Sequence, residues 1–288
     1  MDAPPDSATL IDSHAHLDDE RLACRGESVM ARARAAGVAA VVTIADSVAS
    51  SRRVAALAQQ WPEVFGAVGV HPHDARNVAE PHWDELRRLA ADGRIVAVGE
   101  CGLDYCRDLS PRDAQRRVFA RHLALAREAG LPVVVHCRDA YGDCLAILRS
   151  EMSPPICGVL HCFQGDGAAA REALDLGLRL GVGGSLTFPR EEALRRVVAT
   201  LPLDRLLVET DAPYLTPRPK HGHNEPAYVR FVAERLAEVL GVPFERVAEE
   251  TTENARRLFR LPMLSSECRC PPKRIEDEDD DEDEDDRE

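Results

Sequence analysis

Lysine is almost absent from this sequence. Lys220 and Lys273 are the only lysines, and the other 34 basic residues are arginines. No lysine precedes position 220, so neither a Schiff-base lysine nor a carbamylated lysine bridging two metals can lie on an early strand. Enzyme classes that depend on such a lysine are therefore excluded.

Long apolar runs and paired cysteines are also lacking. No apolar run approaches the roughly 20 residues that a membrane-spanning helix needs. The first eight residues carry two acids, two prolines and no base, which is unlike a signal peptide. The nine cysteines include no Cys-x-x-Cys pair, which favours reduced thiols over a disulfide framework. We therefore expect a soluble cytoplasmic protein with no membrane partner.

The net charge of −14 is concentrated at one end of the chain. Residues 276–288 contain twelve acids and one arginine, so they contribute −11, and the rest of the chain is only about −3. Such a run is typical of a solvated, disordered tail. We predict an acidic tail over 263–288, for which the sequence specifies no partner, and a short N-terminal extension over 1–8.

Apolar periodicity predicts eight strands that alternate with helices. The predicted strands are 9–12, 38–44, 64–70, 94–99, 131–135, 157–160, 178–182 and 206–208. The predicted helices are 27–36, 48–60, 83–91, 111–129, 140–149, 167–176, 191–200, 227–240 and 244–259.

Most of these strands are continuous apolar runs, as expected of a parallel sheet that is covered on both faces. Eight such units fit an α/β fold, a (β/α)₈ TIM barrel forming a single domain over residues 9–262. A doubly wound open sheet is the alternative, but it would need a glycine-rich phosphate loop, and residues 99–102 (GECG) do not match one.

Two histidines near the start of the chain, His14 and His16, are candidate metal ligands. Alternate side chains of a strand point the same way, so both imidazoles share one face. An isolated His-x-His is more often structural. Here, however, four further ligand-type residues stand at the ends of other predicted strands: Glu100, His136, His161 and Asp211. In a closed barrel those ends meet on one face, so the set predicts a metal site.

Four histidines and two carboxylates suit two divalent ions. Glu100 is on the central strand, and only a carboxylate has two oxygens with which to reach both ions. Two such ions lower the pKa of a shared water and stabilise charge on a phosphoryl centre. Asp211 is placed to accept the proton of the attacking water.

Seven motifs together resemble the signatures of the TatD family of metal-dependent deoxyribonucleases, which belong to the amidohydrolase-like TIM-barrel hydrolases. The motifs are 12–18 (DSHAHLD), 69–73 (GVHPH), 99–105 (GECGLDY), 136–140 (HCRDA), 160–165 (LHCFQG), 209–215 (ETDAPYL) and 224–229 (NEPAYV). They extend from about residue 9 to about residue 260, in order. The segment 217–223 (PRPKHGH) departs from the family pattern because it lacks an expected Lys-Arg pair, which bears on substrate preference.

This resemblance implies hydrolysis of DNA phosphodiester bonds, typically as a 3′→5′ exonuclease. It implies one metal held by His14, His16, Glu100 and Asp211, and a second held by Glu100, His136 and His161, with Mg²⁺, Mn²⁺ or Zn²⁺ as occupants. It also places His71, His73 and Arg138 near the site, where they would contact substrate phosphate. An arginine suits that role because its guanidinium pairs bidentately with phosphate oxygens.

Two alternatives remain open at this point. One is a binuclear hydrolase of a small ester, amide or phosphoester, and the other is an inactive barrel that acts as a binding protein. For the nuclease, a body close to neutral predicts modest, salt-dependent affinity for a polyanion. We therefore expect action on single-stranded DNA or 3′ ends, by a monomer or weak oligomer.

Overall fold

The computed structural model describes residues 9–263. The predicted extension over 1–8, and the predicted acidic tail apart from Met263, lie outside the described residues.

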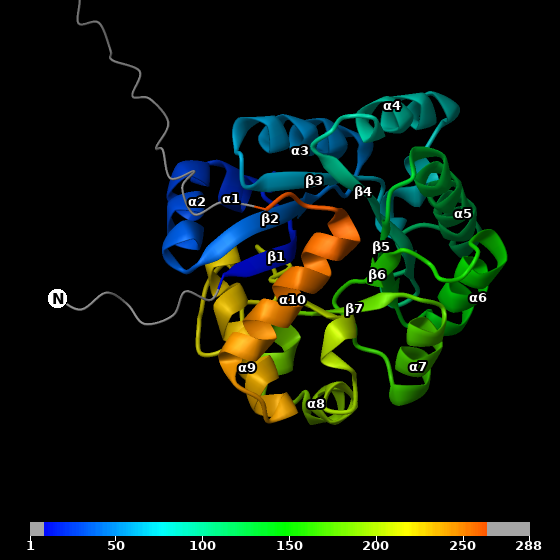
Figure 1. The fold of residues 1–288 in the computed structure, drawn as a ribbon. Coiled ribbons are helices and arrows are strands. Elements are labelled where there is room, and N and C mark those ends of the chain that lie inside the picture. The colour runs from blue at the N-terminus through cyan, green and yellow to red at the C-terminus, as the bar shows by residue number, and fades with distance from the viewer. Residues whose placement is uncertain (1–8, 264–288) are drawn as a thin grey trace, which may run out of the picture.

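Eight parallel strands form one sheet in chain order, as Figure 1 shows. They are β1 (Leu10–Ala15), β2 (Val38–Ile44), β3 (Val64–Val68), β4 (Ile95–Asp104), β5 (Val133–Arg138), β6 (Gly158–Leu160), β7 (Arg179–Val182) and β8 (Leu206–Val208). The first strand meets the chain just after the last one through a parallel bridge between Ala15 and Ala212. There the Asp211 N–H donates to the His14 carbonyl (2.8 Å), and the His16 N–H donates to the Ala212 carbonyl (2.7 Å). The predicted (β/α)₈ barrel is confirmed.

Ten α-helices accompany these strands among the described residues. They are α1 (Glu20–Ala23), α2 (Gly26–Ala35), α3 (Val48–Gln60), α4 (Glu80–Ala90), α5 (Arg112–Ala129), α6 (Tyr141–Glu151), α7 (Gly167–Asp175), α8 (Glu192–Val198), α9 (Val229–Leu240) and α10 (Phe244–Phe259). The short α1 and four 3₁₀ segments were not predicted, because elements of three to six residues are too short to show helical periodicity. None of the helices in residues 9–263 has the length and apolarity to cross a membrane.

The barrel interior is a separate apolar core, closed at one end by the last helix. Inward side chains such as Ile11, Phe65 and Leu207 pack with Leu258 and Phe259 of α10. Figure 1 shows α10 lying across the barrel. The Asn254 amide nitrogen of α10 donates to the carbonyls of Leu203 and Leu206 (both 2.9 Å). The amino ends of the strands are thereby sealed, which leaves the carboxyl ends for a site.

Strands β1, β4 and β5 extend further than the sequence predicts, and β1 reaches Ala15 where we expected it to end at 12. We expected strands over 94–99 and 131–135, yet β4 continues to Asp104 and β5 to Arg138. The extensions pair with each other in parallel, Gly102 with His136 and Asp104 with Arg138. Glu100 and His136 therefore lie within strands rather than just after them. The continuous apolar pattern stops earlier because polar residues interrupt the ends of these strands, Glu100 and Asp104 in β4 and His136 and Arg138 in β5.

Candidate metal centre

The first group of ligand atoms is formed where β1 meets the segment after β8. Asp211 Oδ1 lies 3.7 Å from His14 Nε2 and 3.4 Å from His16 Nε2. His16 Nδ1 donates a hydrogen bond to the Ile44 carbonyl at 3.0 Å. That bond occupies Nδ1, so Nε2 is the His16 nitrogen that faces the centre and would be available to a metal.

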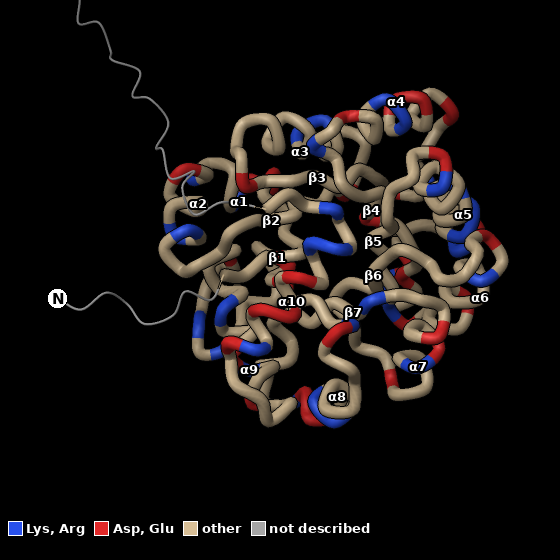
Figure 2. Tube along the Cα trace, viewed as in Figure 1, with Lys and Arg blue, Asp and Glu red and all other residues tan. Residues whose placement is uncertain are grey.

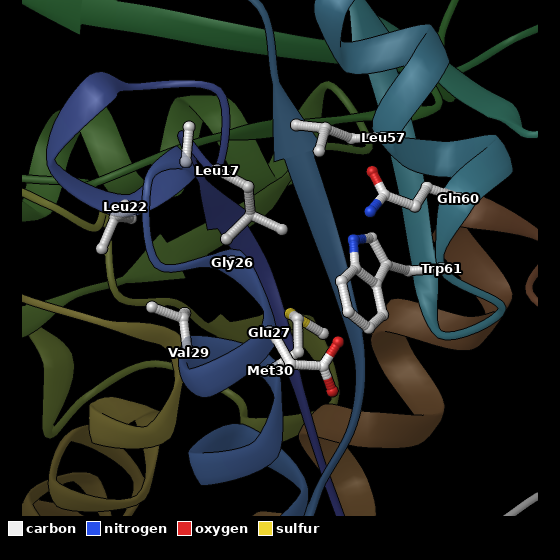
Figure 3. A pocket seen from close by; sticks show the side chains of 10 residues that line it. Leu17, Leu22, Gly26, Glu27, Val29, Met30, Leu57, Gln60 and Trp61 are labelled. Atoms are coloured by element: carbon white, nitrogen blue, oxygen red, sulfur yellow. The ribbon is translucent and has the colours of Figure 1, made fainter. Parts of the chain in front are cut away.

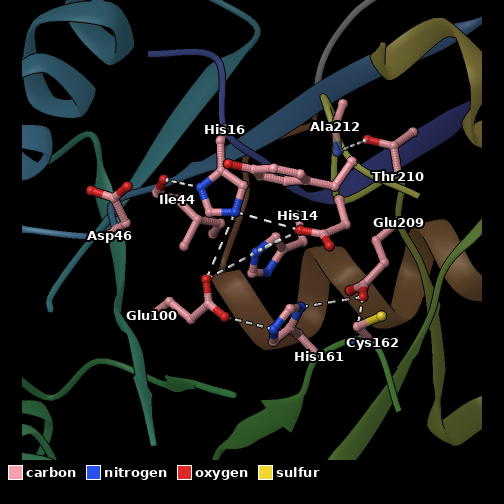
Figure 4. A network of polar contacts seen from close by, with 12 residues as sticks. His14, His16, Ile44, Asp46, Glu100, His161, Cys162, Glu209, Thr210 and Ala212 are labelled. Carbon is pink, nitrogen blue, oxygen red and sulfur yellow. Dashed lines mark hydrogen bonds and ion pairs between the residues drawn. The ribbon is translucent and has the colours of Figure 1, made fainter. Parts of the chain in front are cut away.

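Glu100 lies at the middle of the cluster and is 2% exposed (Figure 4). One carboxylate oxygen, Oε1, is 2.8 Å from His136 Nδ1 and 2.7 Å from His161 Nε2. The other oxygen, Oε2, is 3.5 Å from His14 Nε2 and 3.8 Å from His16 Nε2. Each oxygen thus faces a different pair of histidines, which is the arrangement that a carboxylate bridging two cations requires.

The six sequence-predicted ligands are therefore brought together. Among the described residues, two of the groups with ligand atoms within 4.8 Å of one another are His14, His16 and Asp211, and His14, Glu100 and His161. His136 joins the second of these sets through its 3.2 Å approach to His161.

Unpartnered nitrogens in the buried cluster fit a bound cation. Both ring nitrogens of His14, and Nδ1 of His161, are buried and have no hydrogen-bond partner. A buried polar atom without a partner carries a desolvation cost of about 1–3 kcal/mol. A divalent ion at Nε2 of His14 would offset that cost, so the donor set fits the metal that the sequence predicts.

The two carboxylates of the cluster, Glu100 and Asp211, carry the negative charge that would attract a cation. Burial alone raises the pKa of Glu100, but the charge of His161 and the hydrogen bond with His136 outweigh it, so its pKa is well below the usual range. Burial likewise raises the pKa of Asp211, yet the hydrogen bond from His16 and the charges of neighbouring histidines bring it below its ordinary value. Both carboxylates are anionic, and a metal would compete with the protons on the imidazoles beside them.

Two carboxylates behind the histidines were not predicted from the sequence. Asp104 Oδ2 is 3.3 Å from His136 Nε2, and Glu209 Oε1 is 3.6 Å from His161 Nδ1. Each approaches the far nitrogen of its ring and so turns the near nitrogen toward Glu100, as carboxylates commonly do for metal-binding histidines. The available signal was their place inside motifs already singled out, 99–105 and 209–215.

A further buried carboxylate, Asp12, ties β1 to the segment after β8. Its oxygens accept hydrogen bonds from the Thr210 hydroxyl (2.6 Å) and the Thr210 N–H (2.9 Å). Complete burial raises the pKa of Asp12 to about 8. This contact holds His14 in register with Asp211 across the point where the barrel closes.

The three predicted phosphate-contacting residues also lie at the carboxyl ends of the strands. His71 Nε2 is 3.3 Å from His136 Nδ1 and 3.6 Å from Glu100 Oε1, and His73 Nε2 is 2.8 Å from Asp104 Oδ2. Arg138 is the exposed last residue of β5, two positions beyond His136.

His71, Glu100 and His136 also bring ligand atoms within 4.8 Å of one another. However, His71 Nδ1 accepts the His73 N–H at 3.1 Å, so a neutral ring carries its proton on Nε2. Burial and the neighbouring His136 hold the pKa of His71 well below its usual value, which keeps that ring neutral. The geometry makes His71 a hydrogen-bond donor at the centre rather than a ligand.

An apolar cavity of about 160 Å³ lies beside this region, between α2 and the end of α3 (Figure 3). Its walls include Leu22, Val29, Met30, Leu57 and Trp61. Glu27 is the one ionisable side chain among its lining residues, and no histidine faces it. The ligand atoms therefore gather at the strand ends and not in this cavity.

Comparisons with known proteins agree with this geometry. The family model described as TatD related DNase matches residues 11–260. An uncharacterized metal-dependent hydrolase, YabD of Bacillus subtilis, is 41% identical over 253 residues, covering 88% of this chain and 99% of that protein. The 3′-5′ ssDNA/RNA exonuclease TatD of Dickeya dadantii is 38% identical over 258 residues, covering 87% and 98%.

A solved structure gives the same result. The crystal structure of YJJV, a TatD homolog from Escherichia coli K12, superposes with a TM-score of 0.84 at 32% identity, covering 88% of this chain and 99% of that one. The range that the family model matches, 11–260, contains all six proposed ligands. The chain thus belongs to the TatD-related DNase family and is a metal-dependent hydrolase of that family.

Proposed function

We propose that this protein is a 3′→5′ exonuclease that hydrolyses phosphodiester bonds at the ends of single-stranded DNA, with two divalent cations as cofactors. The names of several relatives, 3′-5′ ssDNA/RNA exonuclease, support the proposal. The observation that carries it is the placement of Glu100, with one oxygen toward His136 and His161 and the other toward His14 and His16.

In this proposal His14, His16, Glu100 and Asp211 would hold one cation, and Glu100, His136 and His161 the other. Mg²⁺, Mn²⁺ and Zn²⁺ all accept such nitrogen and oxygen ligands. When bound, a pair of such ions lowers the pKa of water and neutralises charge that develops on a phosphoryl group. Asp104 and Glu209 would keep the imidazoles turned toward them.

The chain itself supplies a proton acceptor and phosphate contacts. The Asp211 side chain is 14% exposed, so water and substrate can reach its carboxylate, which is anionic and able to accept a proton. His71 would donate its Nε2 proton to a phosphate oxygen. Arg138 forms no ion pair with any residue in 9–263, so its guanidinium is available for a phosphate, and His73 would complete this side of the site.

Surface charge favours ends over duplex tracts. Arginines and acids are interspersed along the outer helices (Figure 2), and many of the arginines are already paired, such as Arg52 with Glu85 and Arg149 with Glu172. A duplex-binding protein normally presents unpaired basic residues to many phosphates. A terminal phosphodiester that enters the strand-end site needs only a few contacts.

A hydrolase of a small ester, amide or phosphoester is the second candidate, because a pair of cations held by these six residues could also activate water toward such a substrate. Many enzymes of that group use a carbamylated lysine as the metal bridge, and here Glu100 occupies the bridging place. This difference favours the phosphodiesterase. An inactive barrel that acts as a binding protein is disfavoured because all six proposed ligand positions are filled and converge.

A metal-dependent digestion panel tests the proposal. Purified protein is loaded with Mg²⁺, Mn²⁺ or Zn²⁺ and incubated with single-stranded DNA, duplex DNA, RNA or small phosphoesters. The same assays are run on Glu100→Gln and on the control Glu128→Gln, which removes an exposed carboxylate from the outer face of α5. We expect wild type to degrade single-stranded DNA from its 3′ end faster than any other substrate. This activity should be absent in Glu100→Gln and unchanged in Glu128→Gln. Metal content measured on the same samples should fall in Glu100→Gln alone. Hydrolysis of small esters without loss of any oligonucleotide would refute the nuclease.

A further inference from the structure

Tyr214 is the one aromatic residue within 9–263 that is exposed, with 48% of its surface open. It stands three positions after Asp211, and its N–H donates to the Asp211 carbonyl at 2.8 Å. This turn places the tyrosine at the rim of the metal centre.

The backbone and the ring of Tyr214 are both held in place. Buried Asn224 donates its amide hydrogens to the Tyr214 carbonyl (2.6 Å) and the Thr210 carbonyl (2.8 Å). The guanidinium of Arg21 lies 4.5 Å from the centre of the tyrosine ring. A ring fixed in this way cannot fold down onto the protein, so its exposure is built into the structure.

Arg21 supports the ring and does not add a free charge. Asp19 accepts two hydrogen bonds from its guanidinium, from Nε at 2.8 Å and from an Nη at 2.6 Å. Because the Asp19 carboxylate neutralises the cation, the stacked pair of Arg21 and Tyr214 presents an aromatic surface rather than a phosphate site.

That surface adjoins the metal centre directly. The Tyr214 ring meets His16 edge to face, with centroids 6.0 Å apart and planes at 78°. A group that lies on Tyr214 is therefore one side chain away from a substrate phosphate at the centre. In a nucleotide the base is joined to the phosphate through a single sugar, so the base is the group that would reach Tyr214.

We propose that Tyr214, supported by Arg21, stacks on a nucleobase next to the bond that is cut and is a specificity-determining residue of the enzyme. This inference rests on the proposed function, because it takes a nucleic acid strand as the substrate. Stacking accepts every base, since each has a π face, and it requires an unpaired base. Tyr214 would thus select single strands over duplexes without selecting sequence.

The test compares two single-stranded oligonucleotides that differ only in the 3′-terminal nucleotide, which either carries its base or is abasic. For each enzyme the ratio of kcat/KM on the two substrates is measured. We expect wild type to prefer the base-bearing end by about 5-fold or more. The ratio of kcat/KM values should fall toward 1 in Tyr214→Leu. It should be largely kept in Tyr214→Phe, which retains the ring. Leu109→Ala removes another exposed apolar side chain and should keep the wild-type ratio.

A binding arm separates this inference from the proposed function. The same oligonucleotides, with a phosphorothioate at the last linkage, are titrated against wild type and Tyr214→Leu by fluorescence anisotropy. A base preference in binding that Tyr214→Leu removes supports stacking, whether or not the enzyme cuts DNA. Hydrolysis of DNA with the same base preference in wild type and Tyr214→Leu would overturn the stacking role and leave the nuclease standing. A wild type that shows no base preference in either arm would also overturn it.

Discussion

His122 provides a sharp test of how burial controls protonation in this fold. It lies on the inner side of α5, fully buried, with its ring 4.9 Å from that of Trp83. Its Nε2 accepts the Val70 N–H at 3.0 Å and its Nδ1 donates to the Val118 carbonyl at 2.8 Å. Both nitrogens are used by the neutral ring, and a second ring proton would point at the Val70 N–H.

Burial lowers the pKa of His122 from 6.5 to about 4. In the unfolded chain the ring titrates near its ordinary value of about 6.5. Between these values the unfolded state binds a proton that the folded state does not, so the free energy of unfolding falls as the pH falls. The loss should reach about 2 kcal/mol between pH 7.5 and pH 5, and about 3 kcal/mol once the pH is below both values.

His122→Gln isolates this contribution. A glutamine oxygen can still accept the Val70 N–H but does not titrate. Urea unfolding followed by circular dichroism at pH 7.5 and pH 5, in a chelator so that metal affinity does not contribute, gives the free energy for each protein. Wild type should lose about 2 kcal/mol more than His122→Gln over this interval. His223→Gln, which removes an exposed histidine, controls for the loss of one imidazole. Equal losses in wild type and His122→Gln would refute the reasoning.

Three further predictions concern the metal centre and the chain end. Chelation should lower the melting temperature of metal-loaded protein by roughly 5–10 °C if the metal is present at about 100 times its dissociation constant, and scanning calorimetry should show no such shift for Glu100→Ala. Gly102→Ala should lower the free energy of unfolding by about 1–3 kcal/mol and reduce the amount of bound metal, because Gly102 has φ +136° and a Cβ there would collide with the His136 carbonyl. The control Gly93→Ala, where a Cβ has open space, should lower it by under about 1 kcal/mol in the same urea titration. Deletion of 276–288 should leave the melting temperature within about 2 °C, since that acidic run offers no apolar surface to a core, and a larger fall would contradict the tail assignment.

Much of the fold could be read from local pattern. The strands Val38–Ile44 and Leu206–Val208, and the helices Val48–Gln60 and Phe244–Phe259, were predicted with the bounds that the structure shows. These segments have long apolar runs or clear caps, so neighbouring residues alone specify them. The main errors are at the carboxyl ends of β1, β4 and β5, where polar residues such as His14, Glu100 and His136 interrupt the apolar run. These ends are held by pairing between strands, which leaves no mark in the periodicity of either strand.

The six proposed ligands were chosen from the sequence by residue type and by position at a strand end, and the structure brings these six side chains together. The partners of those ligands were not predicted. Asp104 and Glu209 orient histidines 32 and 48 positions away along the chain, and only closure of the barrel brings them within reach of the rings.

The sequence by itself determined the barrel, its eight strands and the residue types at the carboxyl ends, because hydrophobic burial and strand geometry act on neighbouring residues. The tertiary structure alone decided which oxygen of Glu100 faces which histidines, which nitrogen of His71 carries the proton, and that Arg21 lies against Tyr214. Those contacts depend on rotamers and hydrogen bonds between side chains from different strands, and they exist only after the chain has folded.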